Sequence, residues 1–312
     1  MKYLLTFLFF VVTLQSFSQD KKPKSLRKET NDTLNKAKIN QYAIITLDRD
    51  TSYVDTSLSL KSDYKLNYLK KDMFGLLPFA NDGGYYTTLD FGSHPTSTMP
   101  SMGFTAKHLN YVQIEDVNYY SVATPLTDLY FKTTQQQGQN TDVLITVNTS
   151  PQFNFSLEYR GMRSLGNYIN EQSTSGNFKF TASYTALNKR YVSNFHFTGQ
   201  DLSNGENGGI TSVENFESGD PDYTKRARLQ VFLKDAKSML KGKRFFYDQT
   251  LRINSKNQQN NLYLTHQFVY ENKYYAYDQK TVKSSIDGST NFFNRFGDSY
   301  LAANIQDRTN FN

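Results

Sequence analysis

The sequence predicts an all-β fold, an antiparallel β-barrel that crosses a membrane with its strands. The first observation is composition: the 312 residues include 23 Tyr and 24 Phe, while all hydrophobic types together reach only 38%. Aromatic residues suit strands better than helices. The second is a series of segments, each about 9–12 residues long, in which apolar and polar residues alternate, as in a tilted strand that crosses a bilayer. The third is a regular change between short and long links.

The first 18 residues have the features of a secretory signal. Lys2 precedes an apolar run over residues 3–14, and the small residues Ser16 and Ser18 follow it. This order predicts cleavage before Gln19. A membrane anchor is disfavoured, because a spanning helix needs about 20 apolar residues. No later segment is apolar enough for such a helix, so residence in a membrane requires strands.

Two regions separate the signal from the predicted strands. Residues 19–40 are basic and are best interpreted as a solvated, disordered tail. Residues 41–118 are extended and polar, and Gly83-Gly84 marks a turn into a short strand. This region either plugs a barrel or lies outside it as periplasmic strands, and the sequence leaves both possibilities open.

Residues 119–312 carry the predicted barrel strands. Alternation is clearest over residues 152–160, 177–184, 227–234 and 244–253, and a first strand is expected near residues 126–134. Together these segments predict about eight strands of an incomplete barrel. The apolar face should contact lipid, with Phe153, Phe155, Phe178, Phe180, Leu229 and Val231. The polar face should line a lumen, with Glu158, Arg160, Lys179, Arg228, Lys234, Arg244, Asp248 and Arg252.

The links between strands predict the topology. Ser150-Pro151 and Asn188-Lys189 are tight, whereas the stretch from Gln200 to Tyr223 is long and rich in Asn, Gly, Asp and Ser. Outer-membrane barrels have short periplasmic turns and long outer loops. We therefore expect residues 200–223 to form a loop displayed outside the cell.

Few residues favour catalysis or cofactor binding. The four His residues are scattered without metal-ligand spacing, Cys is absent, and neither a nucleophile motif nor a phosphate-binding glycine loop occurs. We expect no enzyme activity, no cofactor and no metal site. The net charge of +6 is spread along a chain with an export signal, which disfavours a nucleic-acid partner.

Several stretches follow one another in a recognisable order. They are Tyr64–Asp72 running into Leu77–Asn81, Asn118–Thr133, Tyr159–Gly166, Glu206–Pro221 and Leu240–Arg244. In this order they resemble the family of putative β-barrel porins of Bacteroidetes-type bacteria. The resemblance implies an outer-membrane barrel with a porin-like role. Family chains are longer, and this chain lacks a terminal strand closing on an aromatic residue, so we expect it to be the N-terminal part of a longer barrel.

The leading hypothesis is a porin that lets small solutes cross the outer membrane. A structural or secretion-associated barrel acting as a partner scaffold stays open, as does a soluble exported β-sandwich that binds a ligand. A TonB-dependent receptor is disfavoured, because no convincing energy-coupling box is found. Expected partners are outer-membrane lipid, small solutes and the barrel-assembly machinery, and the oligomeric state is not predicted. Excess Arg and Lys on the polar face predicts a mild preference for anions, unless acids and bases pair across strands.

Overall fold

The computed structural model describes residues 37–55, 60–90, 102–136, 138–186, 189–254, 262–279, 285–286, 289–290 and 304–311. These residues form antiparallel strands, short 3₁₀ helices and two short α-helices, so the predicted all-β fold is confirmed. The predicted signal, with Ser16, Ser18 and Gln19, lies outside the described residues, as does the basic stretch up to residue 36. Among the described residues, no helix is long and apolar enough to cross a bilayer.

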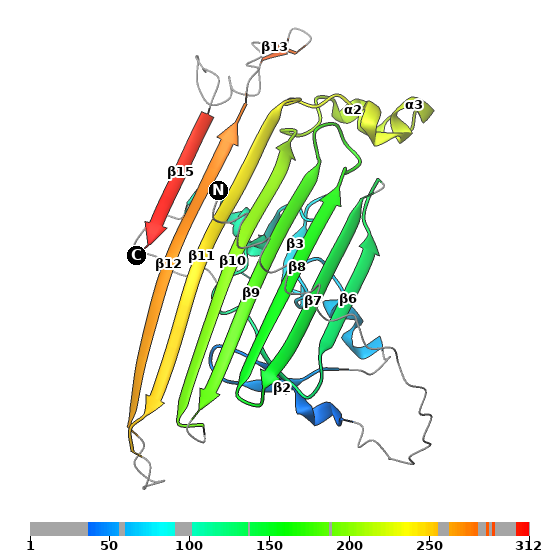
Figure 1. Cartoon of the computed structure of the whole chain (residues 1–312). Coiled ribbons are helices and arrows are strands. Elements are labelled where there is room, and N and C mark those ends of the chain that lie inside the picture. Colours follow the sequence, from blue (N-terminus) through cyan, green and yellow to red (C-terminus); the bar gives the residue numbers. More distant parts are fainter. Residues whose placement is uncertain are drawn as a thin grey trace, which may run out of the picture. The chain divides into compact units, whose positions relative to one another are not determined.

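Eight strands form one antiparallel sheet in which neighbours in sequence are also neighbours in space (Figure 1). The order is β6-β7-β8-β9-β10-β11-β12-β15, with β6 and β15 at the two edges of the described sheet. The predicted strand near residues 126–134 and the predicted number of strands are both confirmed. The expected absence of a terminal strand ending on an aromatic residue is wrong, because the last strand of the sheet ends at Phe311. The bounds are Leu126–Thr133 (β6), Gln139–Ser150 (β7), Phe153–Ser164 (β8), Ser173–Ala186 (β9), Tyr191–Glu206 (β10), Ala236–Arg252 (β11), Tyr263–Asp278 (β12) and Asn304–Phe311 (β15). Separate two-residue strands, Ser285–Ile286 (β13) and Ser289–Thr290 (β14), pair with each other.

The sheet has two chemically different faces. Because side chains alternate along a strand, β8 places Asn154, Ser156 and Glu158 on one face and Leu157 and Tyr159 on the other. We call the first the polar face and the second the apolar face. Buried members of the polar face include Asn154, Ser156, Asn177, Thr181, Asn194, His196, Thr198 and Arg244. Exposed members of the apolar face include Leu157, Tyr159, Phe178, Tyr184, Phe245, Phe268 and Tyr270.

Residues 37–122, here called the N-terminal segment, belong to the same compact unit as the sheet. They contain a three-stranded sheet of order β2-β1-β5 and a β3-β4 hairpin. The hairpin confirms the predicted turn at Gly83-Gly84, although β5 was expected to belong to the barrel. The elements are Ile39–Gln41 (η1), Tyr42–Ile45 (β1), Thr51–Tyr53 (β2), Leu60–Lys65 (η2), Leu76–Pro78 (β3), Tyr86–Thr88 (β4), Thr105–Asn110 (η4) and Tyr119–Val122 (β5).

The N-terminal segment packs on the polar face. Tyr68 and Tyr86 join Met162 of β8 in one buried cluster. Tyr111 joins Leu240 of β11 and Leu202 of β10 in another. Burial of a large apolar side chain contributes about 1.5–3 kcal/mol, so these clusters help to anchor the segment on the sheet.

Glycine makes room for one of these contacts. A Cβ atom at Gly242 of β11 would lie 1.9 Å from the hydroxyl oxygen of Tyr111. The aromatic side chain of the N-terminal segment can therefore approach the strand only where the strand lacks a side chain.

The link between β10 and β11 corrects two predictions. The predicted loop over residues 200–223 begins later, because β10 continues to Glu206. The predicted strand over residues 227–234 is wrong, because this stretch lies in the link and starts with the 3₁₀ turn Arg226–Arg228 (η5). Figure 1 shows the link at one end of the sheet with two short helices, Val213–Glu217 (α2) and Pro221–Thr224 (α3).

The alternation in this link has a local cause. The backbone N–H of Phe232 donates to the carbonyl of Gly209, and that of Leu233 donates to the carbonyl of Asn207. Residues 230–233 are thus extended against 207–211 within the link, with Val231 and Leu233 buried. Extended backbone with one buried side gives the same period of two as a membrane strand.

Candidate functional site

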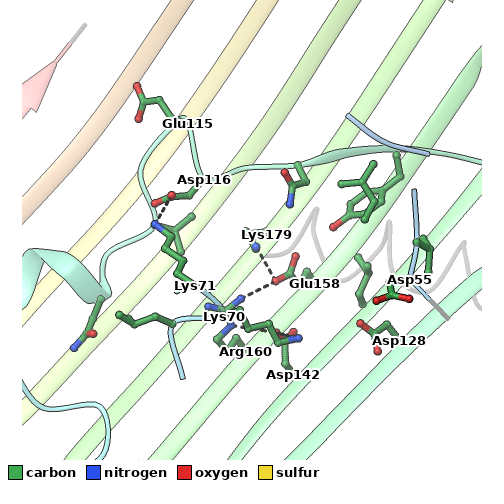
Figure 2. A pocket seen from close by; sticks show the side chains of 18 of the residues that line it. Asp55, Lys70, Lys71, Glu115, Asp116, Asp128, Asp142, Glu158, Arg160 and Lys179 are labelled. Atoms are coloured by element: carbon green, nitrogen blue, oxygen red, sulfur yellow. Dashed lines mark hydrogen bonds and ion pairs between the residues drawn. The ribbon is translucent and has the colours of Figure 1, made fainter. Parts of the chain in front are cut away.

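A cavity of about 700 Å³ is lined by the N-terminal segment and by the polar face of β6 to β9. Figure 2 shows charged side chains of both signs around it, contributed from both sides. The N-terminal segment supplies Asp55, Lys70, Lys71, Glu115 and Asp116. The strands supply Asp128, Asp142, Glu158, Arg160 and Lys179.

Five of these side chains form a chain of ion pairs, here called the charge ladder. The guanidinium of Arg160 lies 3.1 Å from an Asp142 oxygen and 3.5 Å from a Glu158 oxygen. The same Glu158 oxygen lies 2.7 Å from the Lys179 ammonium, and Lys70 lies 2.8 Å from Asp142. The strand register sets this order, since Arg160 is opposite Asp142 and Glu158 is opposite Lys179. Each strand base in the ladder therefore has an acidic partner.

Lys70 reaches the ladder from a tight turn of the N-terminal segment. Its backbone φ is 53°, in the left-handed region that L residues rarely adopt. The side-chain amide of Asn67 donates to the carbonyls of Tyr64 and Lys71 and closes the turn. The ammonium of Lys70 also lies 5.0 Å from the centre of the Tyr130 ring on β6. The turn thus joins the segment to two neighbouring strands.

A second contact between the N-terminal segment and the sheet is fully buried. The Lys107 ammonium donates to Asn204 Oδ1 at 2.7 Å and to the Ser238 hydroxyl at 2.9 Å and carbonyl at 3.1 Å. Its side chain is 0% exposed. Burial lowers the pKa of Lys107 to about 7, against the opposite effect of the Glu206 and Asp201 carboxylates.

A third contact uses a histidine. The Nε–H of Arg244 donates to His196 Nε2 at 3.2 Å, and a guanidinium N–H of Arg244 donates to the Val112 carbonyl at 3.1 Å. Because arginine can only donate, Nε2 accepts, and Nδ1 carries the proton toward the Tyr119 hydroxyl 2.9 Å away. Burial raises the pKa of Tyr119, which keeps this hydroxyl protonated.

The opposite face of the same strands carries a row of aromatic rings. Phe178 lies 6.2 Å from Phe197, and Phe197 lies 4.7 Å from Phe245, measured between ring centres. Phe245 is in turn 6.5 Å from Tyr270 on β12. These offset contacts run across four strands, β9 to β12, on a face that nothing in the described chain covers.

Most predicted site residues lie on the face that the alternation indicated. Phe153, Phe155, Phe178 and Phe180 are on the apolar face. On the polar face lie Glu158, Arg160, Lys179, Arg244, Asp248 and Arg252.

Four predicted site residues belong to the link instead. Arg228 is in η5 and pairs with Asp222, and Lys234 donates to Gln230. Leu229 and Val231 are 2% and 1% exposed and pack within the link, so the expectation that they face lipid is wrong.

Sequence reasoning missed the residues that join the N-terminal segment to the sheet. Lys70, Lys107 and Tyr119 occur in a stretch without periodicity, so no local signal marks them. His196 did carry a local sequence signal. It alternates with Phe195 and Phe197 and so belongs to the polar face. In the part of the chain that the structure describes, no three His, Asp or Glu side chains are placed to hold a metal ion.

Comparison with known proteins identifies a family. No curated protein and no solved structure matches the chain. A family model described as "Putative porin" matches residues 38–312. The match includes the N-terminal segment as well as the sheet, and it confirms the resemblance found in the sequence. The chain belongs to the putative porin family.

Proposed function

We propose that the chain lets small solutes pass through the lumen of an outer-membrane β-barrel. Membership of the porin family supports an outer-membrane barrel, and the passage of solutes is the further step. In this proposal the polar face lines the lumen and the apolar face contacts lipid.

The observation that carries the proposal is that the apolar face of the sheet is exposed while the polar face is buried, the reverse of a soluble protein. Tyr159 and Phe268 on the apolar face are 52% and 50% exposed, whereas Asn177 and Thr198 on the polar face are 1% and 0% exposed. A soluble sandwich would bury its apolar face and leave polar residues in water. Lipid on the apolar side and a polar lumen on the other match the pattern of transmembrane barrels.

The N-terminal segment has a role in this proposal as a partial plug. Its contacts through Lys70, Lys107 and Tyr119 hold it on the polar face. Beside these contacts the cavity of about 700 Å³ leaves space for water and small solutes. The segment would therefore narrow the lumen and set an upper limit on solute size.

Liposome swelling with the full-length protein tests the proposal. We expect swelling in small sugars, with rates that fall as the sugar grows. Protein that is folded in the liposomes but gives no swelling with any sugar would contradict it. The scaffold alternative predicts that second result, and the occupation of the polar face by the N-terminal segment is the observation in its favour.

The proposed topology has its own test. The link over residues 207–235 would lie outside the cell, and the short turn at Pro151 would lie in the periplasm. An epitope tag inserted at the exposed Gly219 should be labelled on intact cells. Labelling only after the outer membrane is opened would reverse the topology.

A further inference from the structure

We propose that the cavity beside the N-terminal segment favours cationic solutes over anionic ones. This inference rests on the proposed solute passage and names the class of solute. It reverses the preference for anions that the basic residues of the strands alone predict.

The basic residues of the strands that line the cavity do not act as free charges. Arg160 pairs with Asp142 and Glu158, and Lys179 pairs with Glu158. Outside the cavity, Arg244 is 3.4 Å from Glu271. Acidic partners at these distances cancel most of the field that a passing ion would experience from each base.

The N-terminal segment changes the charge balance of the cavity. It adds the bases Lys70 and Lys71, but it adds three carboxylates as well. The complete lining has four basic residues, which are Lys70, Lys71, Arg160 and Lys179. It has six acidic residues, which are Asp55, Glu115, Asp116, Asp128, Asp142 and Glu158. With every carboxylate ionised, the lining carries a net charge of 4 − 6 = −2.

One exposed carboxylate of the lining lies on the edge strand β6. Asp128 on β6 is on the polar face, opposite Leu144 of β7, and is exposed. Figure 2 shows Asp128 and Asp55 on one side of the cavity, with Glu158 and Lys179 further along it. A solute that enters the cavity therefore meets the exposed carboxylate of Asp128, while the four bases of the lining are each within 3.1 Å of an acidic side chain.

The expected size of the effect follows from Coulomb's law. One unit charge about 8 Å from a passing ion in water changes the ratio of cation to anion permeability on the order of two- to fivefold at low salt. The Debye length is about 10 Å at 0.1 M salt, so the selectivity should weaken as salt increases.

Reversal potentials in planar bilayers test the inference with the full-length protein. Under a KCl gradient we expect K⁺ to be more permeable than Cl⁻. Asp128→Asn should lower the permeability ratio about two- to fivefold. The matched control is Asp222→Asn, which removes the same charge from an exposed carboxylate in the link and should leave the ratio unchanged. A wild-type channel that prefers Cl⁻, or an Asp128→Asn ratio equal to that of the wild type, would overturn the inference while leaving solute passage intact.

A protein that conducts no ions would refute the proposed function. A binding measurement would still test the inference in that case. Saturation-transfer NMR on the detergent-solubilised protein compares 1,4-diaminobutane with succinate, a dication and a dianion of the same chain length. We expect transfer to the diamine, reduced in Asp128→Asn and unchanged in Asp222→Asn. Equal transfer to both probes, or transfer to succinate alone, would show that the cavity does not favour cations.

Discussion

On β9, Asn177, Lys179 and Thr181 are buried, while Phe178 between them is 38% exposed. Two faces of the same strand therefore require different surroundings. Much of the polar face is paired inside the chain, through hydrogen bonds and ion pairs to the N-terminal segment and between neighbouring strands. The apolar face has no such cover among the described residues, and its aromatic rings contact mainly one another. The polar face is thus stabilised by contacts within the chain, whereas the stability of the apolar face depends on the surrounding solvent or lipid.

The largest expected effect is on the polar face, at Asp142. Its carboxylate is 3% exposed and pairs with both Arg160 and Lys70. Asp142→Asn removes the acidic partner of Lys70 and one of the two acidic partners of Arg160, and it should reduce the free energy of unfolding by about 3–5 kcal/mol. Urea unfolding in detergent micelles, followed by tyrosine fluorescence since the chain has no Trp, measures the change. Asp222→Asn breaks an exposed pair and should cost about 0–1 kcal/mol. Equal costs for the two variants would mean that the N-terminal segment does not pack on the polar face in solution.

On the apolar face we expect the next largest effect. Phe180 lies beside Phe195, with ring centres 6.1 Å apart. Phe180→Arg places a charge on the face assigned to lipid and should cost about 2–4 kcal/mol if the site is near the bilayer midplane. Unfolding from lipid vesicles gives the value, and Phe180→Leu is the control that keeps the residue apolar. A tolerated arginine would indicate that this face meets water.

At Lys107 the expected effect is smaller and depends on pH. Lys107→Met leaves Asn204 Oδ1 without its donor, which should cost about 1–3 kcal/mol. The exposed Lys61 gives a control, Lys61→Met, that should cost little.

The pH dependence has a definite sign. The folded pKa of Lys107 is about 7, while the ordinary pKa of a lysine is 10.5. Between these values the unfolded chain binds more protons, so the Lys107 contribution to the free energy of unfolding rises with pH. Below pH 7 this contribution is constant and at its lowest. Groups that influence Lys107 are Glu206 and Asp201 on β10 and Lys237 on β11. Unfolding between pH 7 and 9 should show a slope that Lys107→Met reduces, and an identical slope in both proteins would refute this assignment.

The smallest effect on stability is expected from two cysteine substitutions, whose chemical labelling compares the two faces directly. Phe197 and Thr198 are neighbours on β10 with opposite orientations, and Thr198 Oγ1 is buried without a hydrogen-bond partner in the described structure. The chain has no Cys, so Phe197→Cys and Thr198→Cys each introduce a unique thiol. A lipid-soluble maleimide should modify the first in vesicles and the second only after unfolding. The reverse reactivity would exchange the two faces.

The faces were predictable from the sequence, because alternation is local and acts over a single strand. The register that brings Arg160 opposite Asp142 was not predictable from the sequence. It depends on the length of the β7-β8 turn and on a register irregularity between Asn148 and Ser150. At Leu229 and Val231 the sequence pattern was misleading. The period of two is present there, but it comes from packing within a link and not from a membrane strand. The position of the N-terminal segment on the sheet could not be predicted from local sequence patterns. Lys107 and Ser238, for example, are 131 residues apart, and no periodicity connects them.

The long separations in sequence determine when the N-terminal segment can fold. The Tyr111 hydroxyl donates to Glu271, 160 residues further along the chain, and the Tyr85 hydroxyl reaches Ser238, 153 residues further along. Closing loops of this length costs conformational entropy before any contact forms, so such contacts form late and slowly. The contacts of the N-terminal segment with β10 to β12 can therefore form only after these strands have been placed, although its own hairpins, β1-β2 and β3-β4, are local. We therefore expect the segment to dock late in folding, and its docking covers polar side chains of several strands at once.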